Sequence, residues 1–376
     1  MKKELLWYGP AYSFSGYATH NRYMLLGLED LGWKIKLVGT EKNIPETLIG
    51  KERLIKMTKN VLSDEKNAIC VNLVPPPGLP AYGKHTILFT TLESLTVHEG
   101  YLRRCQQYDE VWVPCRDNYL SMLNAGWPSR KLHLIPEGYD DSIYSPGQTP
   151  LPGVKSDKFT FMFVGDWSYR KGIQWMIPAF CKAFTKEDNV RLLISSHYQG
   201  GEDERSRARI RDEYQEILQK NKITDPPNIE FIYDWIPDDK LGEFYNSADC
   251  MVLLSCGEAW ALPLMQGMAS GIPAITTSWG GQNDYINKKN GYPVKIKKFD
   301  TIHDKIKLSV DFYWYQLFAF PDVEDATKQF RRAYDNQADA KKKGERAQRE
   351  VSKKYTWKQA ALKANKRLEK ICKSLT

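Results

Sequence analysis

The sequence predicts an α/β protein made of two doubly wound domains that face a central cleft. The chain has 376 residues, which is too many for one ordinary core and enough for two domains of about 150–200 residues each. Short apolar runs alternate with longer amphipathic stretches from one end to the other, as they do in parallel sheets covered by helices. A segment rich in proline and glycine, residues 145–153, interrupts this alternation and indicates a linker between the two domains.

Before the linker, six short apolar runs predict strands and two amphipathic stretches predict helices. The strands are expected at residues 5–8, 35–39, 69–73, 86–90, 111–114 and 133–135, and the helices at 17–31 and 116–125. After the linker, strands are expected at residues 159–164, 190–195, 229–233, 250–254 and 273–276, and helices at 172–185, 204–220, 238–246 and 263–270.

These elements place the first domain at residues 1–150 and the second at residues 151–355. The last predicted helix, about residues 356–376, has no strand after it, and we expect it to pack back on the first domain. Ligands of such sheets bind beyond the carboxyl ends of the strands. We therefore expect the functional site in a cleft between the two domains.

The composition is that of a globular protein from a reducing compartment. Hydrophobic residues make up 42% of the chain and charged residues 27%. The sequence has no run of about 20 apolar residues that could span a membrane, and its first apolar stretch is too short for a signal peptide. The seven cysteines include no CxxC pair, so we expect neither a disulfide framework nor a zinc knuckle, and we predict a cytoplasmic protein.

The formal charge of +8 is concentrated near the C-terminus. Residues 338–376 contain 13 Lys and Arg against 4 Asp and Glu, so the remainder of the chain is nearly neutral. Such a segment can contact anionic lipid headgroups at a membrane surface, or it can be a solvated helix face. No nucleic-acid-binding motif accompanies the charge, and we expect no nucleic acid partner.

Two loops that follow predicted strands have the composition of anion-binding loops. Residues 12–18 form a small loop with Gly16 before a helix, where bare backbone N–H groups can meet an anion, although plain turns share this composition. Arg170 and Lys171 stand at the start of the helix predicted at 172–185, where positive charge opposes the helix dipole. A bound diphosphate would remove this conflict, and a solvated pair of side chains is the alternative.

A third loop lies within residues 255–273, between two predicted strands. Glu258 is a lone carboxylate in an otherwise apolar loop, and we expect it to be unpaired until sugar hydroxyls bind it, or else to form a cap or an ion pair. Pro263 is placed to open a helix, whose first free N–H groups would then point to a phosphate. Gln266 lies one turn further along this helix and can reach a group rich in hydroxyls.

Residues 255–273 resemble the donor-binding motif of the GT-B glycosyltransferases, in particular the large retaining family 4, the glycosyl transferases group 1. That motif has an acidic residue, seven further positions, a second acidic residue and then Ala-Met-Ala-x-Gly-x-Pro. Glu258 matches the first acidic residue, and Gln266 replaces the second. Further segments similar to the family pattern extend the resemblance over nearly the whole chain, at residues 108–114, 135–146, 165–172, 280–284, 320–322 and 355–357.

The resemblance implies the GT-B fold, with two Rossmann-like domains, and an activity. That activity is the metal-independent transfer of a sugar, with retention, from a nucleoside-diphosphate sugar to an acceptor hydroxyl. Arg170 and Lys171 would hold the diphosphate and stabilise the leaving group, and Glu258 would bind the transferred sugar. Gln266 would bind the ribose. Further donor or acceptor contacts are expected from Gly16, Tyr233, Trp235, Ala261, Leu262, Pro263 and Leu264.

On the first domain, His98 and Glu93 are candidates for the residue that many family members place near the donor sugar. The resemblance implies that the leaving phosphate helps to take the proton of the acceptor, so the two carboxylates of a glycoside hydrolase are not needed. No cofactor is expected besides the donor substrate. The six scattered histidines indicate no metal site.

The sequence leaves the acceptor open among a glycan, a lipid and a protein. One alternative is a nucleotide-sugar epimerase or a sugar phosphorylase of the same fold. A second is a non-catalytic nucleotide-sugar-binding protein, because Gln266 and Asp166 replace the residues usual in the family. A third is a scaffold protein that acts through its basic C-terminal segment.

Overall fold

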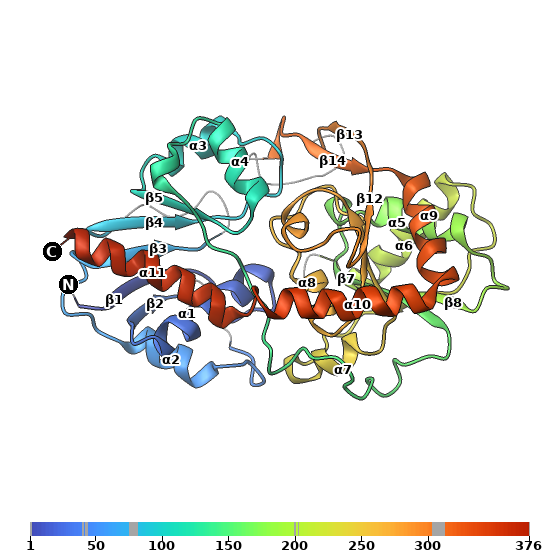
Figure 1. Ribbon diagram of the computed structural model, residues 1–376, viewed down its shortest axis with the longest axis horizontal. Helices are drawn as coiled ribbons and strands as arrows, with labels where there is room; N and C mark the ends of the chain where they lie inside the picture. Colours follow the sequence, from blue (N-terminus) through green and yellow to red (C-terminus); the bar gives the residue numbers. More distant parts are fainter. Residues whose placement is uncertain are drawn as a thin grey trace. The chain divides into compact units, whose positions relative to one another are not determined.

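The computed structural model describes residues 2–39, 41, 44–74, 82–198, 201, 203–302 and 313–375 of the chain (Figure 1). These residues divide into two compact units. The first takes the described residues of Met1–Gly138, Ser309–Gln316 and Lys354–Thr376, and the second those of Tyr139–Leu308 and Leu317–Lys353. Each unit is built around one six-stranded sheet, so the predicted pair of α/β domains is confirmed.

The first unit has a parallel sheet with the strand order β2-β1-β3-β4-β5-β6. Its strands are β1 (Glu4–Tyr8), β2 (Lys34–Val38), β3 (Ile69–Asn72), β4 (His85–Phe89), β5 (Glu110–Val113) and β6 (Leu132–Leu134). Its helices are α1 (Gly16–Asp30), α2 (Lys51–Lys59), α3 (Glu99–Cys105), α4 (Arg116–Asn124), the 3-10 helix η1 (Ser129–Lys131) and α11 (Trp357–Leu375). The strands β3 and β5 are buried along their whole length, as in sheets covered on both faces.

The second unit has a parallel sheet with the strand order β12-β11-β10-β7-β8-β9. Its strands are β7 (Phe159–Asp166), β8 (Val190–His197), β9 (Ile229–Ile232), β10 (Cys250–Leu253), β11 (Ala274–Thr277) and β12 (Tyr292–Val294). Its α-helices are α5 (Ile173–Ala183), α6 (Glu204–Lys220), α7 (Leu241–Tyr245), α8 (Leu262–Ala269), α9 (Val323–Asp335) and α10 (Gln337–Ser352). The 3-10 helices η2 (Tyr169–Lys171), η3 (Asp238–Lys240) and η4 (Gly281–Asp284) and the antiparallel strands β13 (Ile296–Asp300) and β14 (Phe318–Pro321) complete it.

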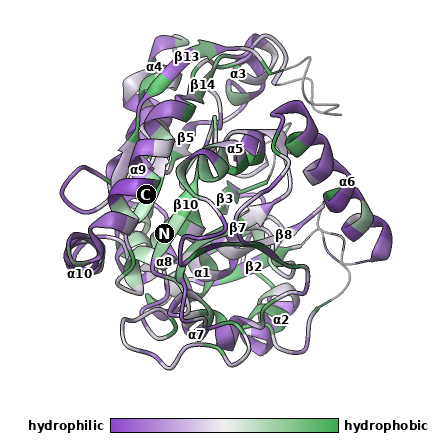
Figure 2. Ribbon diagram, turned by 90° about the vertical axis from the view of Figure 1, so that its right-hand side faces the viewer, coloured by the Kyte–Doolittle hydropathy of each residue, from purple (hydrophilic) through white to green (hydrophobic). Residues whose placement is uncertain are grey.

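All the strands predicted from the sequence are present, and their ends lie within two residues of the predicted ones. Several other elements were not predicted, namely α2, α3, α9, α10 and strands β12 to β14. The buried stripes of α9 and α10 consist mainly of alanine and glycine, such as Ala326, Ala333, Ala340 and Gly344. Figure 2 shows α10 as predominantly hydrophilic, so its apolar period is weak in the sequence.

The segment rich in proline and glycine packs on the second unit. The backbone N–H of Leu151 donates to Glu243 O at 3.1 Å and to Ser247 Oγ at 3.0 Å. A Cβ atom at Gly271 would lie 3.0 Å from the Cβ of Pro146. The chain passes from the first unit to the second at Gly138, earlier than the boundary at 150 that we expected from the composition. The proline-rich segment is therefore held by specific contacts rather than being a free linker.

Helix α11 belongs to the first unit and packs on α1. The two helices approach closely at Gly27, where a Cβ atom would lie 2.6 Å from the Cβ of Ala361. The indole Nε1 of Trp33 donates to Asn365 Oδ1 at 2.7 Å. The last helix thus packs on a unit whose sheet strands all come from the first 134 residues of the chain.

A buried carboxylate ties α11 to the first sheet. Glu110, at the start of β5, is 3% exposed and accepts two hydrogen bonds from the guanidinium of Arg367. Its oxygens also lie 3.2 Å from the Nε2 atoms of His85 and His133, on the neighbouring strands β4 and β6. Although burial disfavours the charge, His133, His85 and Arg367 hold the pKa of Glu110 well below its usual value. The Glu110 carboxylate therefore links strands β4, β5 and β6 to α11.

Replacing Arg367 with alanine should weaken the first unit. The change leaves a buried carboxylate without its bidentate cation, and we expect the free energy of unfolding to fall by about 3 kcal/mol, as measured by urea denaturation at pH 7. Lys366→Ala, at an exposed position of the same helix, should change it by less than about 0.5 kcal/mol. Equal effects of the two variants would contradict the role given to Glu110.

Candidate functional site

The candidate site lies where the chain changes direction within the second sheet. From β7 the chain proceeds outwards through β8 to β9, and it then returns to place β10 on the other side of β7. The loops that leave the carboxyl ends of β7 and β10 therefore diverge, and crevices at such points are where open α/β sheets bind ligands. The first loop carries η2 before α5, and the second carries residues 254–261 before α8.

Arg170, Lys171 and Glu258 meet at this point. Glu258 Oε1 accepts a hydrogen bond from Arg170 Nη1 at 2.9 Å and one from Lys171 Nζ at 2.8 Å. Arg170 Nη1 also donates to Gly257 O at 2.7 Å. The carboxylate is 5% exposed. The structure thus brings together the three residues that the sequence singled out, and we name them the Arg170–Lys171–Glu258 cluster.

The expectation that Glu258 is an unpaired carboxylate is wrong. Burial alone would raise the pKa of Glu258, but Lys171 and Arg170 hold this pKa below its usual value, so the side chain is an anion between two cations. Glu258 also supplies the negative charge that lets two cations stand next to the start of α5. The ion pair was one of the alternatives for this residue, and it forms between loops that are 87 residues apart in the chain.

Glycines fix the backbone of both loops. Gly172 has φ +85, and a Cβ atom there would lie 1.9 Å from Leu254 O, so no other residue fits at this junction. Next to it, Cys256 N donates to Arg170 O at 2.9 Å. On the other side of the cluster, Gly281 N donates to Glu258 O at 2.9 Å. The backbone around the three charged residues is therefore held from both sides by neighbouring loops.

The start of α8 offers fewer donors than the sequence suggested. Pro263 has no N–H group, and the N–H of Leu264 already donates to Ala261 O at 3.1 Å. Among the residues that the structure describes, we find no acceptor for the N–H groups of Ala261 and Leu262. Ala261 has φ +66, a left-handed conformation that is unfavourable for a residue with a side chain. Tyr285 Oη stabilises this turn by donating to Trp260 O and Ala261 O.

Gln266 lies one turn into α8, as predicted, and its side chain already has a partner. Its Oε1 accepts a hydrogen bond from the buried Tyr245 hydroxyl at 2.9 Å. The bond fixes which end of the amide faces the interior and leaves the NH₂ group as the end that can donate to a ligand. The assignment of Gln266 to a ribose stays a prediction.

Two aromatic residues follow β9 at the same edge of the second sheet. Tyr233 stacks on Phe231, with ring centroids 5.8 Å apart. Trp235 stacks on His197, with ring centroids 3.8 Å apart and an angle of 10° between the planes. His197 was not predicted as a site residue, because β8 was expected to end at residue 195, whereas the strand continues to His197. The polar residues at the end of this apolar strand were the sequence signal that could have identified His197.

The candidates of the first domain lie in the first unit, whereas the Arg170–Lys171–Glu258 cluster lies in the second. Gly16 begins α1, and a Cβ atom there would meet nothing within 4 Å. Glu93 accepts a hydrogen bond from the Tyr313 hydroxyl. His98 is the N-cap of α3, where its Nδ1 accepts from Gly100 N at 3.1 Å. The catalytic role of His98 and the binding roles of Gly16 and Glu93 stay predictions.

The described part of the chain has neither a cluster of metal ligands nor a membrane-spanning helix. No group of three or more His, Cys, Asp or Glu side chains within it is arranged to hold a metal ion. No helix within it is long and apolar enough to cross a membrane.

The family match covers a segment that lies almost entirely in the second unit. Residues 158–309 match the family described as "Glycosyl transferases group 1". Over 151 residues, 40% of this chain, the sequence is 29% identical to an uncharacterised glycosyltransferase of Methanocaldococcus jannaschii. Over 162 residues, 42% of this chain, it is 26% identical to the mannosylfructose-phosphate synthase of Agrobacterium fabrum. These segments span 35% and 34% of the two relatives, so the chain matches about a third of their length.

A solved structure is similar over nearly the whole chain. The complex of Anabaena HepE with UDP-glucose aligns with a TM-score of 0.69 over 98% of this chain and 99% of that one, at 10% sequence identity. At this identity the likeness shows the fold. The predicted GT-B fold, with two Rossmann-like domains, is confirmed.

Replacing Glu258 with glutamine should destabilise the second unit. The change leaves two partly buried cations next to each other, and we expect the free energy of unfolding to fall by about 3 kcal/mol at pH 7. Because folding lowers the pKa of Glu258, its contribution is complete above the unfolded carboxyl pKa of about 4.3. It is lost as the pH falls below that value towards the folded pKa.

Urea denaturation of wild type and Glu258→Gln across this pH range checks the prediction. The difference between the two proteins should be largest near neutral pH and should narrow in acid. Glu216→Gln, which removes an exposed carboxylate from α6, serves as the control and should show little difference at any pH. If the difference in free energy of unfolding between wild type and Glu258→Gln grew as the pH fell, the result would contradict the ion pair.

Proposed function

We propose that this chain transfers a sugar from a nucleoside-diphosphate sugar to an acceptor hydroxyl, with retention and without a metal ion. The chain belongs to the glycosyl transferases group 1 family through residues 158–309. The observation that carries the proposal is the Arg170–Lys171–Glu258 cluster. It lies inside the matched segment, at the point of the second sheet where ligands of open α/β sheets bind.

The charges of the cluster suit a diphosphate. Two cations and one carboxylate leave an excess of one positive charge. The ammonium of Lys171 has three N–H donors, and one of them is used by Glu258. The two N–H groups at the start of α8 for which we find no acceptor among the described residues would add neutral donors. In the proposed reaction these groups stabilise the charge that develops on the leaving diphosphate.

The free oxygen of Glu258 suits a sugar hydroxyl. Both cations bind Oε1, and no described residue donates a hydrogen bond to Oε2. A carboxylate held in this way can accept a hydroxyl through Oε2 while Oε1 keeps the cations in place. Glu258 would thereby fix the position of the anomeric carbon relative to the diphosphate.

The remaining roles complete the proposed donor site. Gln266 would bind the ribose through its NH₂ group, and Tyr233 and Trp235 would face the base, with His197 stacked behind Trp235. A catalytic role for His98 and a sugar-binding role for Glu93, both in the first unit, are also part of the proposal. The leaving phosphate would help to take the proton from the acceptor, so no second carboxylate is required.

The donor and the setting are part of the same proposal. The complex of HepE with UDP-glucose supports a nucleotide sugar as the donor, and the acceptor would be a hydroxyl of a glycan, a lipid or a protein. All seven cysteines are free thiols, which supports a reducing, cytoplasmic location. If the acceptor is a lipid, the basic C-terminal segment would contact the membrane surface.

The second candidate function is a nucleotide-sugar-binding protein without turnover. Gln266 favours it, because an amide stands where the family has a carboxylate and its oxygen is already bonded to Tyr245. An epimerase or a phosphorylase of the same fold would use the same cluster. The transferase, the epimerase and the binding protein differ in the products that they form from the donor, which the second of the following experiments measures.

Binding of the donor should depend on the cluster. In thermal-shift measurements with UDP-, GDP- and ADP-sugars, we expect one nucleotide class to raise the melting temperature of the wild type. Lys171→Ala and Glu258→Ala should each lose most of this shift, because they remove a diphosphate contact and the residue that positions both cations. Lys220→Ala, at an exposed position of α6, should retain it. Shifts of equal size in all four proteins would place the donor elsewhere.

Turnover should occur at the same site with retention and without metal. When the preferred donor is incubated without an acceptor, we expect slow hydrolysis by water, and proton NMR should show that the released sugar first has the anomeric configuration of the donor. EDTA should leave the rate unchanged. Release of the opposite anomer would exclude the retaining mechanism, a new nucleotide sugar would indicate an epimerase, and donor binding without products would favour the binding protein.

A further inference from the structure

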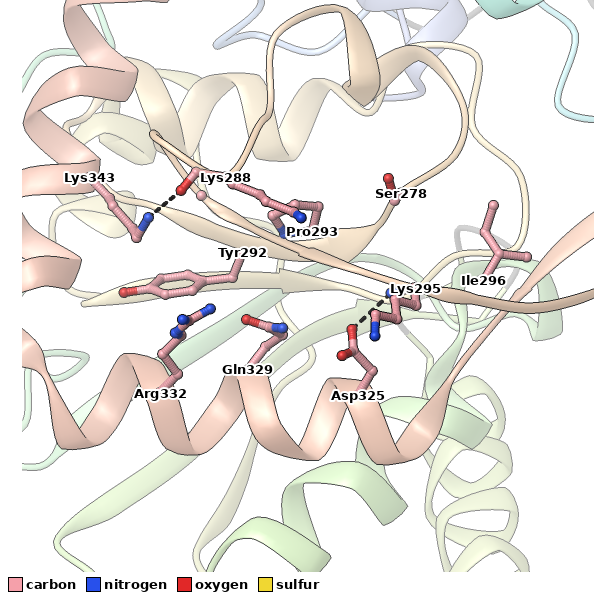
Figure 3. Close-up of a pocket in the computed structure, with 11 residues that line it drawn as sticks. Ser278, Lys288, Tyr292, Pro293, Lys295, Ile296, Asp325, Gln329, Arg332 and Lys343 are labelled. Carbon is pink, nitrogen blue, oxygen red and sulfur yellow. Dashed lines mark hydrogen bonds between the residues drawn. The ribbon is translucent and has the colours of Figure 1, made fainter.

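The second unit contains a cavity that the proposed transfer does not use. It has a volume of about 780 Å³ and lies against the edge strand β12, between the turn that precedes this strand and the helices α9 and α10 (Figure 3). This volume is in the range of sites for small ligands. None of the described residues that line the cavity belongs to the Arg170–Lys171–Glu258 cluster or to α8.

Positive charge dominates the lining of this cavity. Lys288, Lys295, Arg332 and Lys343 face one carboxylate, Asp325. Asp325 is itself occupied, because its Oδ2 accepts from the backbone N–H of Lys295 at 2.9 Å. Within the described ranges, no carboxylate forms an ion pair with Lys288, Lys295 or Arg332. The cavity therefore has an excess of positive charge that the protein itself does not neutralise.

Lys343 is the least exposed of the four cations. Its ammonium donates to Lys288 O and lies 5.1 Å from the centroid of the Tyr292 ring. Its nearest carboxylate oxygen, on Asp339, is 4.0 Å away. Burial lowers the pKa of Lys343, Asp339 opposes this, and the charge of Arg332 lowers it further. A bound anion would relieve both the loss of hydration and the repulsion between the two cations.

Tyr292 supplies a second, independent indication of a ligand. The residue is 1% exposed, and its hydroxyl is buried with no hydrogen-bond partner among the described residues. A buried hydroxyl without a partner costs free energy, about 1–3 kcal/mol. Burial also raises the pKa of Tyr292, so the group is a neutral donor at physiological pH. Figure 3 shows the Tyr292 ring between the Lys343 and Arg332 side chains, at one end of the cavity.

Helix α9 adds two donors, Gln329 and Arg332, and the acceptor Asp325 along the opposite wall. Asp325, Gln329 and Arg332 are spaced four and three residues apart, which places them on one face of the helix, and all three line the cavity. The cavity therefore combines a planar guanidinium, ammonium groups, an amide and a phenol hydroxyl. A phosphate has the several acceptor oxygens and the charge near −2 that such a set of donors requires.

We propose that this cavity binds the phosphate group of a small soluble phosphomonoester, at a site separate from the donor site. A phosphate dianion offsets most of the excess positive charge, the Tyr292 hydroxyl gains its missing acceptor, and the volume leaves room for the group that carries the phosphate. The proposal does not depend on the proposed transfer reaction, because it uses none of the residues of the Arg170–Lys171–Glu258 cluster.

Isothermal titration calorimetry of the full chain tests the proposal, with inorganic phosphate and glucose 6-phosphate as probes at constant ionic strength. Wild type should bind at least one of the probes. The double variant Arg332→Gln/Lys343→Gln should bind it at least about tenfold more weakly, a difference of about 1.4 kcal/mol. The control Lys341→Gln/Lys342→Gln removes the same charge from exposed positions of α10 and should bind as wild type does. Lys171→Ala should also bind as wild type, which separates this site from the donor site.

Tyr292→Phe keeps the test decisive if the double variant folds poorly. Loss of the hydroxyl should weaken binding several-fold, while the melting temperature without ligand should stay the same or rise, because the group has no partner in the free protein. Three results would overturn the proposal. They are the absence of binding of both probes to wild type, unchanged binding in the double variant or in Tyr292→Phe, and loss of binding in Lys171→Ala. Binding to anionic phospholipid vesicles but to neither soluble probe would overturn it as well.

Discussion

The second unit depends on one carboxylate held between two cations. Glu258 Oε1 receives Arg170 and Lys171, and through them it joins the loop after β7 to the loop after β10. Its carbonyl oxygen receives Gly281 N, so the turn after β11 is joined as well. Three loops that leave neighbouring strands are thus fixed around one buried charge. The sheet brings these loops together, and the ion pairs determine how their ends are oriented.

This arrangement prepares the site before any ligand arrives. The two cations are already oriented and partly shielded from water, so they need little reorganisation when negative charge develops next to them. Two adjacent, partly buried cations are unfavourable in free energy unless a negative charge within the protein balances them. Glu258 provides that balance with one oxygen and leaves the other available. The left-handed turn at Ala261 is a second point where local strain accompanies a candidate binding group.

The sequence predicted much of the fold and part of the site, for reasons that the residues explain. Buried parallel strands such as β10 are continuous apolar runs, so they were found, whereas β12 is only three residues long and contains a proline. Helix α10 was missed because alanine and glycine form most of its buried stripe. The three charged residues of the site were recognised from local motifs. Their pairing was not, because a contact between Lys171 and Glu258 follows from the pairing of β7 with β10 and not from any local pattern. The cavity next to β12 was missed for the same reason.

The route of the chain through the two units has a consequence for how the protein is made. The first unit takes its sheet from residues before Gly138 but its covering helix α11 from residues after Lys354. The ribosome therefore releases the entire second unit before it releases the helix that supplies Arg367 to Glu110. Until residues 357–375 have emerged, the first sheet lacks α11 and Glu110 lacks its bidentate cation. The first unit can therefore complete its contacts only after the polypeptide of the second unit has been synthesised.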